Sequence, residues 1–270
     1  MRYMLSSVIA LVLLAGTEVA AAFDQIHAVW DALLQRHVVV AQDGSASRVD
    51  YAGFQAEQSR LQGYLDGLSS VTQAEYSGWT REQQLAFLIN AYNAFTVRLV
   101  LTRYPGLESI KDLGSFLRSP WRKAFFVLLG AKRSLDDVEQ GLIRAPGAFD
   151  EPRIHFAVNC ASIGCPMLRN KAYVAEGLDA QLEDSARRFL GDRSRNRYDP
   201  ASGALQVSRI FDWYKADFEK GNRGINSVPG FLARYADLLA DGAVARAAVR
   251  QGQAQIRYLD YDWALNDIKH

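Results

Sequence analysis

The sequence is poor in cysteine and histidine. Its 270 residues include only two cysteines and four histidines, and both cysteines lie close to one of the histidines. It has no glycine-rich phosphate-binding loop, no Gly-x-Ser-x-Gly turn and no His pair at zinc-binding spacing. The usual sequence evidence for a nucleotide-dependent enzyme, a serine hydrolase or a zinc peptidase is therefore missing. We predict no cofactor and no metal.

An excess of charge of either sign is also missing. The chain has 31 Lys and Arg against 30 Asp and Glu, which gives a formal net charge of +1. Proteins that bind nucleic acid or anionic membranes usually carry a basic excess. The arginines at 187–197 are interspersed with Asp and Glu, and we interpret them as a solvated helix end and loop. No nucleic-acid partner is predicted.

The one long run of apolar residues that the sequence offers as a possible span is at the N-terminus. Arg2 precedes an apolar stretch over 4–15 and small residues at 20–22, which is the layout of a secretory signal peptide. The stretch falls short of the roughly 20 apolar residues of a membrane helix. We therefore predict a signal peptide at 1–22 and a periplasmic or secreted domain at 23–270. After cleavage we expect no stable membrane insertion.

Periodicity predicts an α+β protein that is mostly helical. Helical spacing of apolar residues occurs at 23–37, 54–69, 81–104, 134–144, 176–191, 208–218 and 228–240, with helical turns and a loop at 107–120. Extended segments are expected at 49–51, 124–133 (a hairpin), 153–160, 204–208 and 254–266. No repeat or low-complexity linker divides this series. We predict a single domain with a small β-sheet that carries the His155–Cys165 segment.

This segment holds the two cysteines and a histidine within a dozen residues. In a strand, His155 and Asn159 would share one face and Cys160 would point to the other. Gly164 in the following turn would let Cys165 fold back towards Cys160. Two thiols and an imidazole could therefore meet.

A thiol beside an imidazole is the minimum for nucleophilic thiol catalysis. Asn159, or an aspartate such as Asp262, could orient the ring. The sequence thus suggests a hydrolase or acyl transferase with His155, Cys160, Cys165 and Asn159 as candidate catalytic residues. Against this, a regular strand points His155 and Cys160 in opposite directions, and nothing indicates a helix N-terminus behind either sulfur.

The predicted export favours another interpretation of the cysteines. Thiols in an oxidising compartment are usually paired. A bridge from Cys160 to Cys165 would close a loop of about six residues and stabilise the fold by about 2 kcal/mol. The protein would then be a non-catalytic binding or assembly module for an unknown small-molecule or envelope ligand. The spacing fits neither thioredoxin-like redox motifs nor common zinc sites.

Two asparagines lie on the most apolar predicted helix. Asn90 and Asn93 are three residues apart, so both project from one face, and buried carboxamides need polar partners. We expect both to approach the His155 segment. They would either hold backbone groups of that segment or line a pocket with His155.

Five ordered blocks of the chain carry a resemblance to a known family. The blocks are Phe87–Ala94, Ser134–Glu139, Arg153–Cys160 with Cys165-Pro166, Ile210–Tyr214 with Asp217-Phe218, and Tyr261–Asn266. Together they resemble the domain of unknown function 547 family. The resemblance implies no established reaction. It does single out family-motif positions, of which Asn90, Asn93, Trp213, Asp262 and Asn266 are candidate binding residues. We interpret the aromatic pairs Trp213-Tyr214 and Tyr261/Trp263 as core packing rather than a ligand-stacking wall.

Overall fold

The longest helix, α5 (Arg81–Leu101), is the centre of the N-terminal half of the molecule. The computed structural model describes residues 22–114 and 119–269, so almost all of the predicted signal peptide at 1–22 lies outside the described part. Thr80 and Gln83 form a capping box that begins α5. Apolar residues surround the helix on nearly all sides, and such a helix is stable only when other elements cover it.

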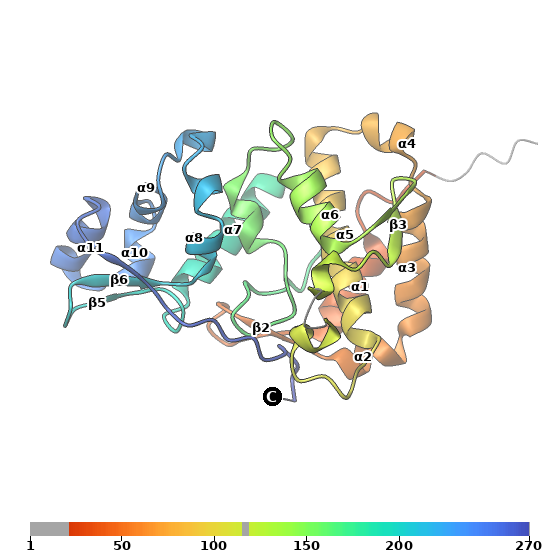
Figure 1. Ribbon diagram of the computed structural model, residues 1–270, viewed down its shortest axis with the longest axis horizontal. Helices are drawn as coiled ribbons and strands as arrows, with labels where there is room; N and C mark the ends of the chain where they lie inside the picture. The colour runs from red at the N-terminus through yellow and green to blue at the C-terminus, as the bar shows by residue number, and fades with distance from the viewer. Residues whose placement is uncertain (1–21, 115–118, 270) are drawn as a thin grey trace, which may run out of the picture.

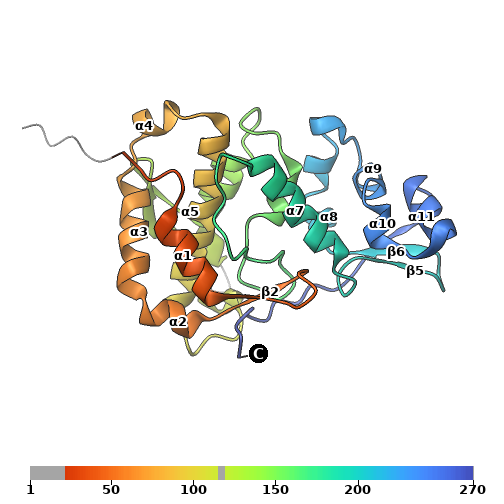
Figure 2. The same ribbon diagram turned by 180° about the vertical axis from the view of Figure 1, so that it is seen from behind.

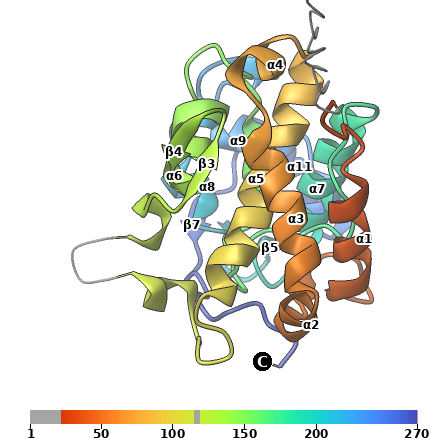
Figure 3. The same ribbon diagram turned by 90° about the vertical axis from the view of Figure 1, so that its right-hand side faces the viewer.

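The covering elements come mainly from the N-terminal third. Figure 3 shows α3 (Gln58–Ser70) beside α5, with α1 (Ala28–His37) and α2 (Tyr51–Ala56) next to α3. By length and hydropathy alone α5 could cross a bilayer, which the sequence analysis did not anticipate. However, 89% of its most apolar window is buried inside the protein. It is the core helix of this half of the fold.

The C-terminal half has a core of its own. Its helices and sheet lie at the opposite end of the molecule from α1–α5 (Figures 1 and 2). The elements are α7 (Leu178–Gly191), α8 (Ile210–Trp213), α9 (Val228–Ala233), α10 (Ala236–Leu239), α11 (Gly242–Arg250), and a sheet of β5 (Arg197–Asp199), β6 (Ala204–Val207) and β7 (Ile256–Tyr258). β6 pairs antiparallel with β5 and parallel with β7.

Two hairpins and several short helices complete the described residues. β1 (Val38–Val40) pairs with β2 (Ser47–Val49), and β3 (Phe126–Leu128) pairs with β4 (Ala131–Arg133) as predicted for 124–133. The short helices are α4 (Gln73–Ser77), α6 (Leu135–Val138), a π-helical turn at Glu139–Ile143, and 3₁₀ turns at Ile110–Leu113, Pro120–Arg122, Pro152–Phe156, Lys215–Phe218 and Asn222–Gly224. The predicted Ser134 cap of α6 is confirmed. The α+β, mostly helical class is confirmed too.

The predicted strand at 153–160 is wrong. Pro152–Phe156 is a 3₁₀ helix, and the chain is irregular from there to Cys165. Glu151 caps this helix by accepting the Arg153 N–H at 3.0 Å, and Pro152 occupies its first turn. Ile154 and Phe156 are both buried, but Ile154 packs in the N-terminal core and Phe156 in the C-terminal core. The alternation of apolar residues therefore reflects a segment between two cores, and no sheet carries it.

The C-terminal segment 261–267 pairs with the cysteine loop and holds it in place. Single β-bridges join Ser162 to Leu265 and Val49 to Asp267. The Gly164 N–H donates to the Asp262 carbonyl at 2.8 Å. A Cβ at Gly164 would lie 2.9 Å from that carbonyl oxygen, so a side chain there would push the two segments apart.

Burial of His27 makes the fold sensitive to acid. Its Nδ1 lies 2.7 Å from the Tyr64 hydroxyl, and burial lowers its pKa to about 4. The unfolded chain binds a proton at this position near pH 6.5, whereas the folded chain does so only near pH 4. The contribution of neutral His27 to the free energy of unfolding is therefore fully present above pH 6.5 and is lost as the pH falls towards 4. For a pKa shift of this size the contribution is about 3 kcal/mol. We expect urea titrations to show a smaller fall in the free energy of unfolding from pH 7.5 to pH 4.5 in His27→Gln than in the parent. An equal loss in both proteins would contradict this.

Candidate functional site

A cavity of about 220 Å³ lies between the two halves of the fold. Its reactive wall includes His155, Cys160, Cys165, Glu139 and Tyr261. These residues come from the 3₁₀ helix at 152–156, the cysteine loop, the π-helical turn after α6 and the C-terminal segment. The fold therefore brings together groups that are more than a hundred residues apart in sequence.

The two cysteines meet in this cavity, as their spacing predicts. Their Sγ atoms lie 2.7 Å apart, and both are free thiols in the structure. The Cys160 N–H also donates to the Cys165 sulfur at 2.8 Å. Cys165 is buried, whereas Cys160 is partly exposed. Cys160 is therefore the thiol that a ligand in the cavity could reach.

The environment of Cys160 favours its thiolate. Burial acts to raise the pKa of this thiol, but hydrogen bonds from Cys165, Ser162 and Tyr261 outweigh burial and lower the pKa to about 7. The Ser162 and Tyr261 oxygens lie 3.1 and 3.3 Å from the Cys160 sulfur. Burial and the bond to Cys160 raise the pKa of Cys165 well above its usual range. Cys165 thus remains a thiol that donates to its neighbour.

Removal of the Tyr261 hydroxyl should make Cys160 less acidic. The Tyr261→Phe change deletes one of the three side-chain donors to the thiolate. We expect the Cys160 pKa to rise by about one to two units, because a hydrogen bond to a charged group contributes about 1.5 to 3 kcal/mol. The pH dependence of iodoacetamide alkylation at Cys160 measures this. Tyr198→Phe, on β5, is the matched control and should leave the profile unchanged. An unshifted profile in Tyr261→Phe would show that this hydroxyl does not stabilise the thiolate.

His155 is held by a carboxylate from the C-terminal half. Its Nε2 lies 2.8 Å from Asp217 Oδ2. Burial acts to raise the pKa of Asp217, but hydrogen bonds from His155, Arg144 and Lys220 hold it well below the usual range. Asp217 is therefore ionised and accepts, so His155 Nε2 must donate. The ring also stacks on Tyr214, with centroids 3.8 Å apart.

The other ring nitrogen of His155 is free to act as a base. Within residues 22–114 and 119–269, Nδ1 is buried and has no hydrogen-bond partner. Burial lowers the pKa of His155 to about 4 and outweighs the opposing effect of Asp217, while Arg144 and Lys220 lower it further. The imidazole is neutral at neutral pH. No hydrogen bond joins it to Cys160 among the described residues, although both line one cavity and such contacts often form only with substrate bound.

Asn159 does not orient the imidazole. Its side chain donates to the Pro166 carbonyl at 2.7 Å and accepts the Ala161 N–H at 2.9 Å. These bonds shape the cysteine loop. Asp217, rather than Asn159 or Asp262, occupies the position beside the ring.

The two asparagines of α5 bind backbone groups instead of lining the cavity. Asn93 donates to the Ala157 carbonyl at 3.0 Å and accepts the Asn159 N–H at 2.8 Å. It therefore contacts the His155 segment as expected. Asn90 does not, because it donates to the Tyr173 carbonyl and accepts the Tyr173 N–H, at 2.7 and 3.0 Å. Of the two interpretations, the one in which these side chains hold the backbone fits the contacts.

The aromatic pairs form a wall of the cavity, which corrects their interpretation as core packing. Trp213 lies 4.8 Å from Tyr261 and 5.6 Å from Trp263, measured between ring centroids. Trp121 contacts Trp263 from the other side. All four line the cavity, and Trp213 is 44% exposed. A ligand in the cavity would rest against these rings.

The remaining candidates lie outside this cavity. Asn266 accepts a hydrogen bond from the Tyr51 hydroxyl at 2.7 Å and is buried away from the cavity. Asp262 is exposed and accepts the Ala264 N–H at 2.9 Å. Within the described part of the chain, no three His, Cys, Asp or Glu side chains gather in a way that could hold a metal ion.

Comparison with known families places this site in context. Residues 76–190 match the model of a family described as protein of unknown function, DUF547. This segment of the chain is similar to the DUF547 family. No curated protein and no solved structure gave a match. The family description assigns no reaction, so the function has to be argued from the site.

The DUF547 segment supplies only part of the cavity. It contains His155 and both cysteines, whereas Asp217 and Tyr261 lie beyond its end. The blocks at 210–218 and 261–266, which also resemble the family, are outside the matched residues. The two groups that tune His155 and Cys160 therefore come from the chain that follows the segment.

Sequence reasoning also missed a buried acidic residue in this cavity. Glu139 is 4% exposed, and burial raises its pKa despite opposing hydrogen bonds from Tyr214 and Tyr92. It lies in the π-helical turn after α6, and such turns are frequent at functional sites. Glu139 ends the Ser134–Glu139 block, so the resemblance held a signal, but nothing in the sequence showed that it was buried.

Proposed function

We propose that this protein is a thiol-dependent hydrolase or acyl transferase, with Cys160 as nucleophile and His155 as base. The observation that supports the proposal most is the content of one cavity. It combines a thiol whose pKa is lowered to about 7 with a neutral imidazole that Asp217 orients and whose Nδ1 is unoccupied. Nucleophilic thiol catalysis needs these components.

The reaction would follow from these groups. The thiol proton of Cys160 passes to His155 Nδ1, which leaves a thiolate beside an imidazolium. The sulfur attacks the carbonyl carbon of an ester or amide, and the leaving oxygen or nitrogen takes the proton from the imidazolium. Water or an acceptor hydroxyl or amine then attacks the thioester with His155 as base, which releases the acyl group and restores the thiol. Asp217 stabilises the imidazolium throughout.

The location of the substrate follows from the predicted signal peptide. A protein exported from the cytoplasm would meet amides and esters of the cell envelope or of secreted material. The aromatic wall formed by Trp121, Trp213, Tyr261 and Trp263 supports a substrate with an apolar face or ring next to the reacting group.

The acyl-enzyme itself provides the test. We expect p-nitrophenyl acetate, an activated ester, to release nitrophenol in a burst and to leave one acetyl group on Cys160 in intact-mass and peptide analysis. Cys160→Ser should abolish the burst. Cys165→Ser is the matched control, because a serine hydroxyl still donates to the Cys160 sulfur. A burst that survives Cys160→Ser, or acetyl groups spread over surface lysines, would refute the proposal.

The close approach of the two sulfurs also favours a second function. If Cys160 and Cys165 are oxidised to a disulfide in the exported protein, the site has no nucleophile and would serve for binding or assembly in the envelope. Thiol counting on protein isolated from the exported fraction without reductant decides between the two. Two free thiols support catalysis, and none supports the binding module.

A further inference from the structure

A second cavity, of about 380 Å³, lies behind the cysteine loop. Its walls come from β2, the Ile163–Gly164 turn, the loop that follows α7, and the C-terminal segment from Leu259 to Asp262. Tyr261 lines both cavities, so the two sites share a boundary. The size is within the range of small-molecule sites in proteins, about 300 to 1,000 Å³.

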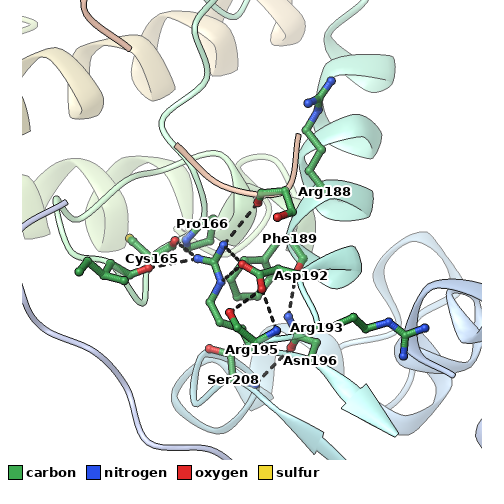
Figure 4. A network of polar contacts seen from close by, with 12 residues as sticks. Cys165, Pro166, Arg188, Phe189, Asp192, Arg193, Arg195, Asn196 and Ser208 are labelled. Carbon is green, nitrogen blue, oxygen red and sulfur yellow. Dashed lines mark hydrogen bonds and ion pairs between the residues drawn. The ribbon is translucent and has the colours of Figure 1, made fainter. Parts of the chain in front are cut away.

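One arginine in this cavity is paired with a carboxylate and with backbone carbonyl groups of the protein. Arg195 forms an ion pair of 2.6 Å with Asp192 and donates to the carbonyl oxygens of Ile163 and Cys165. Figure 4 shows this guanidinium between Asp192 and the end of the cysteine loop. Arg195 thus holds the loop from behind, and its charge is balanced by Asp192.

A second arginine in the same cavity has no such ion pair among the described residues. Arg48 lies on β2 and lines the cavity. Within residues 22–114 and 119–269 its Nη1 is buried without a hydrogen-bond partner, so a ligand in the cavity would contact the other nitrogens of the guanidinium. A guanidinium is always charged, and a charged donor removed from water needs an acceptor. Its planar fork matches a carboxylate, which can accept two hydrogen bonds side by side. The unpaired guanidinium on this wall can therefore receive an anionic group.

The other charged residues of the cavity indicate which kind of anionic ligand could bind Arg48. Asp192 is balanced by Arg195, while Asp260 and Asp262 line the same space as carboxylates at its exposed rim. Two carboxylates against one unpaired guanidinium repel a multiply charged anion such as phosphate. They favour a ligand that carries a cation as well as a carboxylate.

We propose that this cavity binds the carboxylate of a free amino acid or short peptide on Arg48, with an amine of the same ligand at Asp260 and Asp262. A basic amino acid, with two amines, complements the three charges best. The site is separate from the thiol, and the proposal holds whether or not Cys160 is catalytic. Specificity rests on the simultaneous match of both charge signs.

Calorimetric titration of the folded full-length domain with L-lysine tests this directly. We expect saturable binding that weakens at least tenfold for L-lysine amide, which lacks the carboxylate, and for 6-aminohexanoate, which lacks the α-amine. Acetate and inorganic phosphate should bind at least tenfold more weakly than lysine. Cys160→Ser should bind lysine like the parent, which separates this result from the test of the thiol.

Variants then assign the binding to Arg48. Arg48→Gln should weaken lysine binding at least tenfold, and Arg250→Gln, at the exposed end of α11, should have no effect. Arg48→Lys keeps the charge without the fork and should lose less affinity than Arg48→Gln, which also controls for a folding defect. Unchanged affinity in Arg48→Gln, tighter binding of phosphate than of lysine, or no saturable lysine binding by the parent would overturn the proposal.

Discussion

Replacement of Asn93 by Leu is expected to lower the free energy of unfolding by about 3 kcal/mol. The change removes the hydrogen bonds of two buried backbone groups, and each buried group left unpaired costs about 1 to 3 kcal/mol. Those groups are the Asn159 N–H and the Ala157 carbonyl. Leucine has a similar volume, so the change removes the hydrogen bonds without leaving a large cavity. Urea denaturation followed by circular dichroism gives the difference.

Asn222→Ala provides the comparison for Asn93→Leu. Asn222 also uses its amide, to Asp150 at 3.3 Å, but at an exposed position where water can replace the bond. We expect a loss below about 0.5 kcal/mol for this surface change. If Asn93→Leu unfolds at the same urea concentration as the parent, the asparagine does not fix the cysteine loop.

His155→Ala should slow acetylation of Cys160 by p-nitrophenyl acetate at least about 100-fold at pH 6, as expected for loss of a general base. The effect should shrink above pH 8, where Cys160 is already a thiolate and needs no base. Asp217→Asn should give a smaller loss in the same direction, because the amide can hold the ring in the wrong tautomer.

The matched control for Asp217→Asn is Asp212→Asn on α8. Asp212 lies 3.7 Å from Arg209 in an exposed ion pair, so its loss should leave the rate within a factor of two. Stopped-flow measurement of the nitrophenol burst gives the rates of the parent and of the three variants. Equal rates in the parent and in His155→Ala across this pH range would show that His155 is not the base.

Local patterns predicted much of the fold because the forces that decide those parts are local. The Ser134 cap and the 126–133 hairpin depend on neighbouring residues and are found as predicted. The helical spacing of apolar residues at 81–104 predicted the most apolar helix, and α5 is that helix. Several short elements were not predicted, among them β1, α4, β5 and α11, and these bury few side chains of their own.

The error at 153–160 has a tertiary cause. A segment that passes between two cores buries side chains on both sides, and its sequence then resembles a strand. The sequence therefore predicted that His155, Cys160 and Cys165 belong together but not the conformation that joins them. The bend after Phe156, which a regular strand lacks, allows His155 and Cys160 to line one cavity.

The residues that orient His155 and lower the pKa of Cys160 could not be found from sequence spacing. Asp217 is 62 residues from His155, and Tyr261 is 101 residues from Cys160. Both reach the site through long-range packing of the C-terminal half. The sequence offered Asn159 and Asp262 for these roles because they are close in sequence or share a block of the resemblance. Burial of Glu139 likewise depends on contacts that no local pattern records.

The pH dependence of Cys160 alkylation tests the central claim most directly. Intact protein is treated briefly with iodoacetamide from pH 5 to 10, and the modified cysteine is quantified by peptide mass spectrometry. We expect one modified residue, Cys160, with a midpoint near pH 7, and an unmodified Cys165 until the protein unfolds. A midpoint near pH 9, equal modification of both cysteines, or no modification without reductant would contradict the assignment of Cys160 as the reactive thiolate.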